Sequence, residues 1–279
     1  MKSTLFIALM GLMLAFTSGT ALGQESTSNP QTDVDVPDNK NLTEVDSIER
    51  TVYIESQADR FLRQMGDYLK SAGAFTVQSE SSYDVLEHEG QNIRYGGIAE
   101  VALRRTEGLR AAFKGDERQT EMIFNAKTAT MYDFEVNMYA VADVPPDLDS
   151  AIDSVFDRYG FSVPIADLVS SDPYDVLIAD VIEGRWIGRH VVEGVPCNHL
   201  AFIQETIDFQ VWIEDGAQPV PWQLLITYKN EPGSPQYLVR LTDWNFKPQF
   251  SADYFQFIPP EGSDRMEFLT ITEVEVEGE

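Results

Sequence analysis

The most reactive side chains of this sequence lie close together in its second half. Cys197, the only cysteine, is two residues from His199, so the two side chains would share one face of a strand. His190 lies on the preceding segment, across a turn at Glu193-Gly194, and would come near them in a hairpin. A thiol and two imidazoles could form a thiolate–imidazole nucleophile, or could bind zinc or copper.

The neighbouring residues favour a structural role for this group. Pro196 and residues 200–202 are typical of a core strand, and no second cysteine or nearby aspartate completes a set of metal ligands. A metal- or thiol-dependent enzyme is therefore the least favoured hypothesis. We predict no catalytic residue, no metal site and no cofactor.

Three aspartates form a second candidate site. Asp149, Asp153 and Asp157 recur every four residues on an expected helix over residues 146–159. Calcium would need oxygen ligands wrapped around it by a loop, with backbone carbonyls and a turn glycine. The spacing on a straight helix therefore indicates a solvated acidic face.

The elements that position these residues follow from the spacing of the apolar side chains. Residues 58–72 carry them at i, i+3, i+4 and i+7 and predict a helix, with Gly73 as a left-handed C-cap. From Phe75 to Ala142 the period is two, and turn signals recur every 8–14 residues. This pattern predicts an antiparallel meander.

Two helices and a second run of strands follow. Pro146 opens the first helix, and Asp172-Pro173 opens a short one through Ile178. Further strands are expected between residues 185 and 244, giving about eleven in total. One sheet of that size must coil strongly or close. The predicted fold class is mainly β (α+β), a strongly curved antiparallel half-barrel with helices covering its concave face.

The composition excludes several classes of protein. With 279 residues, 43% hydrophobic and 11% aromatic, the chain is too long and too apolar for a disulfide miniprotein or a disordered chain. Its 46 acidic and 20 basic residues give a net charge of −26, which disfavours nucleic acid and anionic headgroups as partners. The sequence contains no Gly-rich phosphate loop, nucleophile elbow or His-Glu-x-x-His motif.

One part of the chain is less acidic than the rest. Residues 94–127 hold seven bases and five acids and could present a basic outer surface to an acidic partner. Pairing of these bases with Glu100, Glu107 and Glu121 is the favoured alternative. The bases concerned are Arg104, Arg105, Arg110, Lys114 and Arg118.

The two ends of the chain differ from its middle. Residues 1–23 predict a signal peptide, because an apolar run too short to span a bilayer follows Lys2 and small residues precede Gln24. Residues 24–50 predict a disordered acidic arm and residues 270–279 an acidic tail, leaving 51–269 as a single domain. No other segment reaches the ~18 apolar residues of a membrane span, so we expect a protein that is soluble after signal cleavage.

Several long segments carry a family resemblance. They are RQMGDYLKSAGAFTVQSESSYDV (63–85), RYGFSVPIADLVSSDPYDVL (158–177), GVPCNHLAFIQETIDFQVWIEDG (194–216), ITYKNEPGSPQYLVRLTDWNF (226–246) and FQFIPPEGSDRMEFL (255–269). Over about residues 52–269 the chain resembles the bacterial family called domain of unknown function 2092. The resemblance implies a periplasmic protein related in fold to the lipoprotein carriers LolA and LolB, and it brings no catalytic residues.

Two hypotheses for the function stay open. In the first, a periplasmic, non-enzymatic binding protein holds a lipid or acylated ligand on the concave face, because each buried methylene contributes about 0.8 kcal/mol. In the second, a cell-envelope interaction or scaffold module fills the core with its own helices and binds an envelope protein. The residues predicted to contact a ligand, on strand faces expected to point inward, are Tyr95, Val101, Phe113, Met122, Trp212 and Tyr237.

Overall fold

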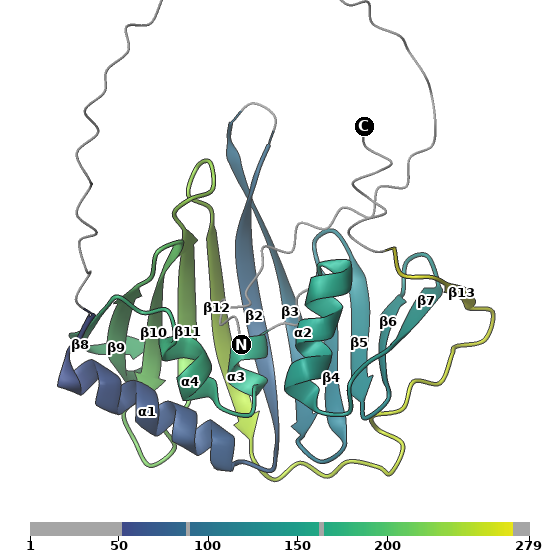
Figure 1. Ribbon diagram of the computed structural model, residues 1–279, viewed down its shortest axis with the longest axis horizontal. Helices are drawn as coiled ribbons and strands as arrows, with labels where there is room; N and C mark the ends of the chain where they lie inside the picture. Colours follow the sequence, from purple (N-terminus) through teal and green to yellow (C-terminus); the bar gives the residue numbers. More distant parts are fainter. Residues whose placement is uncertain (1–51, 88–89, 162–164, 270–279) are drawn as a thin grey trace, which may run out of the picture.

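The computed structural model describes residues 52–87, 90–161 and 165–269. The predicted signal peptide, acidic arm and acidic tail lie outside these described residues. The described chain forms one curved sheet of thirteen strands, with the helices on its concave side (Figure 1). The predicted fold class is therefore confirmed.

Two antiparallel meanders make up almost the whole sheet. The first consists of β2 (Ala74–Leu86), β3 (Asn92–Arg104), β4 (Gly108–Gly115), β5 (Gln119–Asn125), β6 (Thr128–Asp133) and β7 (Met138–Asp143). The second consists of β8 (Glu183–Val192), β9 (Val195–Ile203), β10 (Ile207–Glu214), β11 (Pro221–Tyr228) and β12 (Gln236–Asn245). The last strand of the second meander, β12, pairs antiparallel with the first strand of the first meander, β2, and so joins the two into one sheet.

A short parallel strand closes each edge of this sheet. β1 (Tyr53–Ile54) pairs with β8, and β13 (Asp264–Met266) pairs with β7. These two strands raise the count from the expected eleven to thirteen. With two and three residues, neither is long enough to show a period of two.

Four helices lie on the concave side (Figure 1). They are α1 (Ser56–Ser71), α2 (Leu148–Tyr159), α3 (Ala166–Val169) and α4 (Pro173–Ile178). The Asp147 carboxylate caps α2 by accepting from the Ser150 N–H, and Gly160 ends it at φ 71°. The predicted cap at Gly73 is wrong, because α1 ends at Ala72 in an extended conformation. The single turn α3 is too short to have been predicted.

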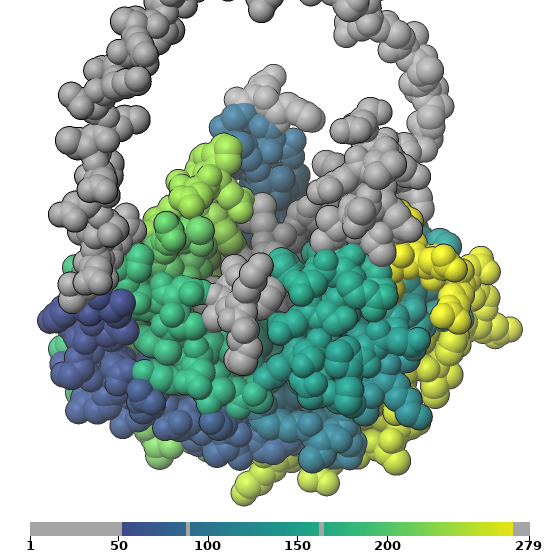
Figure 2. All heavy atoms as spheres, viewed as in Figure 1, coloured from purple at the N-terminus to yellow at the C-terminus, as the bar shows by residue number. Residues whose placement is uncertain are grey.

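The helices and the inner strand faces share one hydrophobic core. α1 contributes every third or fourth residue, including Leu62, Met65 and Leu69, all fully buried. The strands contribute alternate residues, such as Phe202 on β9 and Phe209 on β10, whose rings stack 4.8 Å apart. Figure 2 shows the atoms of α1 and α2 lying over the concave side of the sheet.

The segment after β12 covers the opposite, outer face of the first meander. Phe255 is only 2% exposed and packs against Phe250 and Tyr254. Arg110, on the outer face of β4, donates to the Tyr254 carbonyl at 3.0 Å. Further along the segment, Phe257 packs against aromatic rings of β6 and β7 before the chain reaches β13.

Candidate functional site

Five of the six predicted ligand-contacting residues lie on the inner face. Four of them are buried in the core, namely Val101, Phe113, Met122 and Tyr237. Tyr95 is partly buried, packs against the core, and stacks on Tyr83 with ring centroids 6.1 Å apart. The strands β2 to β5 and β12 therefore bring these side chains to one surface, as alternation along each strand requires.

The expected inward position of Trp212 is wrong. Val211 and Ile213 on either side of it are buried in the core, so Trp212 points to the outer face. There it stacks on His199, with ring centroids 4.0 Å apart and an interplanar angle of 10°. Trp212 belongs to β10, where both faces carry large side chains, so hydrophobicity alone did not identify the inner face.

Two glycines make room for an aromatic ring on the inner face. A Cβ at Gly97 would lie 2.5 Å from the Phe113 ring, and one at Gly115 would lie 2.6 Å from it. Phe113 therefore lies flat across the backbones of β3 and β4. The inner face of the sheet is therefore apolar and nearly flat at this point.

The inner face becomes richer in hydroxyl groups toward one end of β2, β11 and β12. The Tyr83 hydroxyl donates to Glu117 at 3.2 Å, and burial raises its pKa to about 12. Burial likewise raises the pKa of Tyr237 to about 12, against the opposing effect of a hydrogen bond with Ser81. At neutral pH these phenols are protonated and can donate hydrogen bonds.

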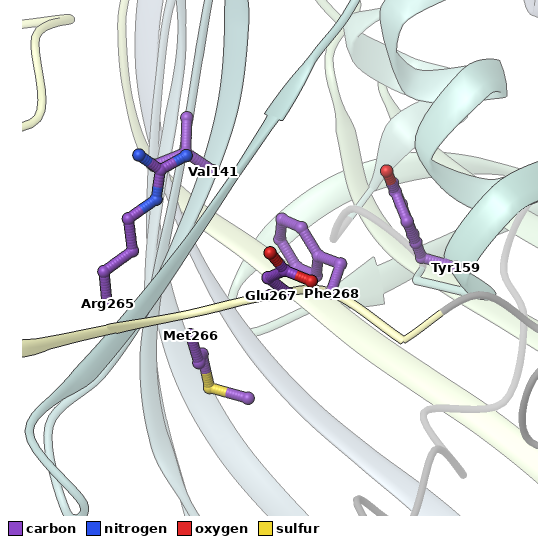
Figure 3. A pocket seen from close by; sticks show the side chains of 6 residues that line it. All are labelled: Val141, Tyr159, Arg265, Met266, Glu267 and Phe268. Atoms are coloured by element: carbon purple, nitrogen blue, oxygen red, sulfur yellow. The ribbon is translucent and has the colours of Figure 1, made fainter.

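Figure 3 shows a cleft of about 580 Å³ at the edge of the sheet, beside the end of α2. Its lining residues are Val141, Tyr159, Arg265, Met266, Glu267 and Phe268. The Phe268 ring stacks on Tyr159 with centroids 4.8 Å apart. Sequence reasoning missed this cleft, because its residues come from the edge strand β7, the end of α2 and the segment around β13.

Two smaller clefts lie elsewhere on the helical side. One of about 290 Å³ is at the start of α2, between Arg105 and Asp149. The other, of about 460 Å³, lies between Tyr68 on α1 and the β10–β11 connection. None of the six predicted ligand-contacting residues lines these three clefts, and two of the three border α2.

The cysteine and the two histidines do meet, on the outer face of the second meander. His190 and His199 approach with their Nδ1 atoms 3.0 Å apart, and His199 Nε2 lies 2.9 Å from Gln210 Oε1. Because Gln210 Oε1 can only accept, His199 carries its proton on Nε2 and accepts from His190 through Nδ1. Cys197 is fully buried, and burial raises the pKa of its thiol to about 11.

This group lacks the features of a reactive centre. A thiol with a raised pKa is protonated at neutral pH and is a poor nucleophile and metal ligand. Across the described parts of the chain, no three His, Cys, Asp or Glu side chains are grouped as a metal site would require. The structural interpretation of Cys197 and His199 is the one that the geometry supports.

The other charged candidates also have structural roles. Asp153 and Asp157 are exposed, as a solvated acidic face requires, and Asp149 accepts from the Ser171 N–H at 3.0 Å. Two of the bases in residues 94–127 form the ion pairs with nearby glutamates that the sequence favours over a free basic surface. Arg104 pairs with Glu107 at 2.7 Å, and Arg110 pairs with Glu121 at 2.8 Å.

Arg105 is partly buried beneath the helix ends and does not contribute to a basic outer surface. Its guanidinium donates to the carbonyls of Leu69 and Ala72 at the end of α1, and to those of Val169 and Ser170 at the end of α3. The burial of this group lowers its pKa. Arg105 thus joins the β3–β4 turn to two helix ends, a role that its neighbours in sequence do not indicate.

A scan against protein-family models matches residues 58–269 to the family described as "Predicted periplasmic protein (DUF2092)". The chain belongs to this family. The match confirms the predicted resemblance, and the family description agrees with the predicted periplasmic localisation. A search of curated proteins found no significant match.

A search of solved structures finds similarity to several bacterial proteins, including the following three. Lipoprotein LppX of Mycobacterium tuberculosis is 14% identical, with 69% of this chain and 97% of that chain covered and a TM-score of 0.44. LprF of Mycobacterium bovis is 12% identical, with 68% and 93% covered and a TM-score of 0.43. A LolA superfamily protein of Nitrosomonas europaea is 7% identical, with 71% and 97% covered and a TM-score of 0.32.

The helices of this fold are short or amphipathic. In the described ranges, none of them is both long enough and apolar enough to cross a bilayer.

Proposed function

We propose that this protein is a non-enzymatic binding protein of the periplasm that holds an acyl chain against the inner face of its first meander. The observation that carries the proposal is the apolar surface that β2 to β5 and β12 present to the helices. Val101, Phe113 and Met122 lie on it, with glycines beneath the Phe113 ring. An acyl chain that packs against this surface would gain about 25 cal/mol for each Å² of its own apolar surface that is removed from water.

The covering helix must move for a ligand to enter, and α2 is the element suited to move. Its buried side chains contact the inner face around β5, and a cleft lies at each of its ends. The first meander would keep its shape during this movement, because the segment around Phe255 holds its outer face. The negative net charge of −26 does not oppose a neutral chain inside an apolar surface.

Native mass spectrometry of protein extracted gently from the periplasm tests this function. We expect a fraction of the molecules to carry a mass corresponding to an acylated compound, identified after extraction into organic solvent. Protein that is ligand-free in every preparation and takes up no apolar dye would overturn the proposal.

A matched pair of variants locates the ligand. Val101→Thr keeps the side-chain shape and replaces a methyl by a hydroxyl on the fully buried inner face. Ile98→Thr also introduces a hydroxyl on this strand, with the loss of one further methyl, at a position that is 59% exposed on the outer face. We expect only Val101→Thr to lower ligand occupancy, by about threefold to tenfold for a contact of about 1 kcal/mol. Equal occupancy in both folded variants would place the ligand elsewhere.

One observation favours the alternative, a cell-envelope scaffold or interaction module with a self-filled core. Phe113, Met122 and Tyr237 are each less than 10% exposed within the chain's own core. In that case α2 would stay closed, and the outer surface would bind an envelope protein. Amide hydrogen exchange distinguishes the two functions, because a permanently closed core protects α2 as strongly as α1.

A further inference from the structure

A buried hydroxyl on the inner face lacks a hydrogen bond. Tyr228, the last residue of β11, is 8% exposed and lies in the hydrophobic core. Its phenolic oxygen is buried and has no hydrogen-bond partner among the residues that the structure describes. Removing such a group from water without replacing its hydrogen bonds costs a few kcal/mol, so it calls for an explanation.

The neighbouring tyrosine provides a contrast. Tyr237, on the adjacent strand β12, is equally buried at 8% exposed, but Ser81 lies beside its hydroxyl and lowers its pKa against the larger effect of burial. Two phenols of the same burial on neighbouring strands are therefore treated differently by the fold. The Tyr237 hydroxyl thus has a polar neighbour within the fold, whereas the described residues offer the Tyr228 hydroxyl no hydrogen-bond partner.

The charges around Tyr228 restrict what that group can be. Burial is the main cause of the raised pKa of the Tyr228 phenol, and Tyr237, Glu231 in the β11–β12 turn and Asp167 on α3, itself 2% exposed, add to it in that order. The phenol is therefore neutral and able to donate. An anionic oxygen arriving here would meet both carboxylates in a region of low dielectric constant, so a neutral acceptor is favoured.

We propose that Tyr228 is the polar anchor of the ligand site and donates its hydroxyl hydrogen to the ester carbonyl of a neutral acyl ester. This inference rests on the proposed function, and it adds the chemical class of the ligand. The acyl chain follows the apolar inner face, and the ester reaches the hydroxyl-rich end of β2, β11 and β12. A free fatty acid of the same length binds less tightly, because its carboxylate faces Asp167 and Glu231.

Displacement of an apolar dye from the full chain tests this assignment. N-phenyl-1-naphthylamine is the reporter, and monomyristoylglycerol and myristate are the competitors, so that chain length is constant. We expect the ester to displace the dye at about one-tenth of the concentration that myristate requires, since tenfold in affinity corresponds to about 1.4 kcal/mol. Equal potency of the two competitors would overturn the proposal.

Tyr228→Phe and Tyr237→Phe are the matched variants. Tyr228→Phe removes only the unpartnered hydroxyl, so we expect dye binding to be unchanged and the potency of the ester to fall about fivefold to tenfold, as for one hydrogen bond. Without ligand, this variant should melt at the same temperature as the natural protein or higher. Tyr237→Phe should melt at a lower temperature, because it loses the polar interaction of its hydroxyl with Ser81.

The outcomes separate this inference from the function on which it rests. If the natural protein binds neither dye nor ester, the proposed function itself fails. If the dye binds but Tyr228→Phe leaves the ester's potency unchanged, only the polar anchor is wrong. If Tyr228→Phe melts as low as Tyr237→Phe without ligand, the hydroxyl holds a structural bond, such as one to an ordered water, and the anchor is again wrong.

Discussion

The two meanders of this sheet are held from opposite sides. The second meander is covered on its inner face by α1, which contacts β8, β9 and β10 and packs against α4. The first meander is covered on its outer face by the segment around Phe255, and its inner face lies under α2. The inner face of the first meander can therefore be uncovered while the segment around Phe255 still supports its outer face.

The polar side-chain contacts of α1, over the second meander, also differ from those of α2, over the first. On the α1 side, Arg63 donates to the Tyr174 hydroxyl at 2.6 Å and lies over its ring, and the same hydroxyl donates to Asp59. Lys70 pairs with Asp172 at the start of α4. On the α2 side, Asp149 near the start of the helix accepts from the Ser171 N–H, and Arg158 near its end donates to the Asp143 carbonyl. We therefore expect the α1 side to behave as a fixed cover and the α2 side as the weaker one.

The largest effect on stability should come from adding a side chain at the point where α1 and α4 are in close contact. A Cβ at Gly66 would lie 2.5 Å from the Tyr174 Cβ and 2.8 Å from the Tyr174 backbone nitrogen. Gly66→Ala must therefore push α4 away, and we expect a loss of about 3 kcal/mol in the free energy of unfolding, although alanine favours a helix. Urea denaturation measures this loss. Gly73→Ala is the control, because no atom lies within 4 Å of its Cβ position and it should change stability by less than about 0.5 kcal/mol.

The next effect concerns Arg105, which joins the ends of α1 and α3. Arg105→Met removes a charged donor that serves four carbonyls at the ends of α1 and α3. We expect a loss of about 2 kcal/mol in thermal or urea unfolding, because the buried carbonyls lose their partner. Arg104→Met, the neighbouring substitution, removes an ion pair with Glu107 near the surface and should cost less than about 1 kcal/mol. Equal losses would mean that Arg105 acts through side-chain volume alone.

A smaller, local effect tests the weakness of the α2 side. Asp147→Ala removes the N-cap of α2, which accepts from the Ser150 N–H at 2.9 Å, and should cost about 1 kcal/mol. The exchange of amide hydrogens should then quicken in α2 and stay unchanged in α1. An equal rise of the exchange rate in both helices would contradict the proposed difference between them, because it would show that α1 and α2 unfold as one unit.

The smallest effect is a dependence of stability on pH, which arises from His199 on the outer face of the second meander. Burial, together with the nearby His190, lowers the pKa of His199, against the opposing effect of its bond with Gln210. The unfolded chain therefore takes up this proton at a higher pH than the folded chain, so stability is full above about pH 6.5 and falls as the pH drops below it. Unfolding between pH 7.5 and 5 should show this fall in the natural protein and less of it in His199→Gln. An equal fall in both would assign the effect to other groups.

The strands, the longer helices and the family can all be predicted from the order of residues along the chain. The period of two from Phe75 to Ala142 reports burial on one side of each strand, and the stripe on α1 reports burial on one side of a helix. These patterns are local, because each depends only on which neighbours along the chain are apolar. The family resemblance over about residues 52–269 rested on long segments and needed no spatial information.

The inner face of the sheet and the hydrogen-bond partners of its polar groups depend on contacts between segments that are far apart in the chain. Trp212 has the composition of a core residue, but the register of β10 turns it to the outer face, onto His199. Arg105 reaches carbonyls up to 65 positions away in the chain, and Tyr228 is distinguished from Tyr237 only by the bond that it lacks. Such roles arise from contacts between distant segments, which hydrophobic periodicity does not encode.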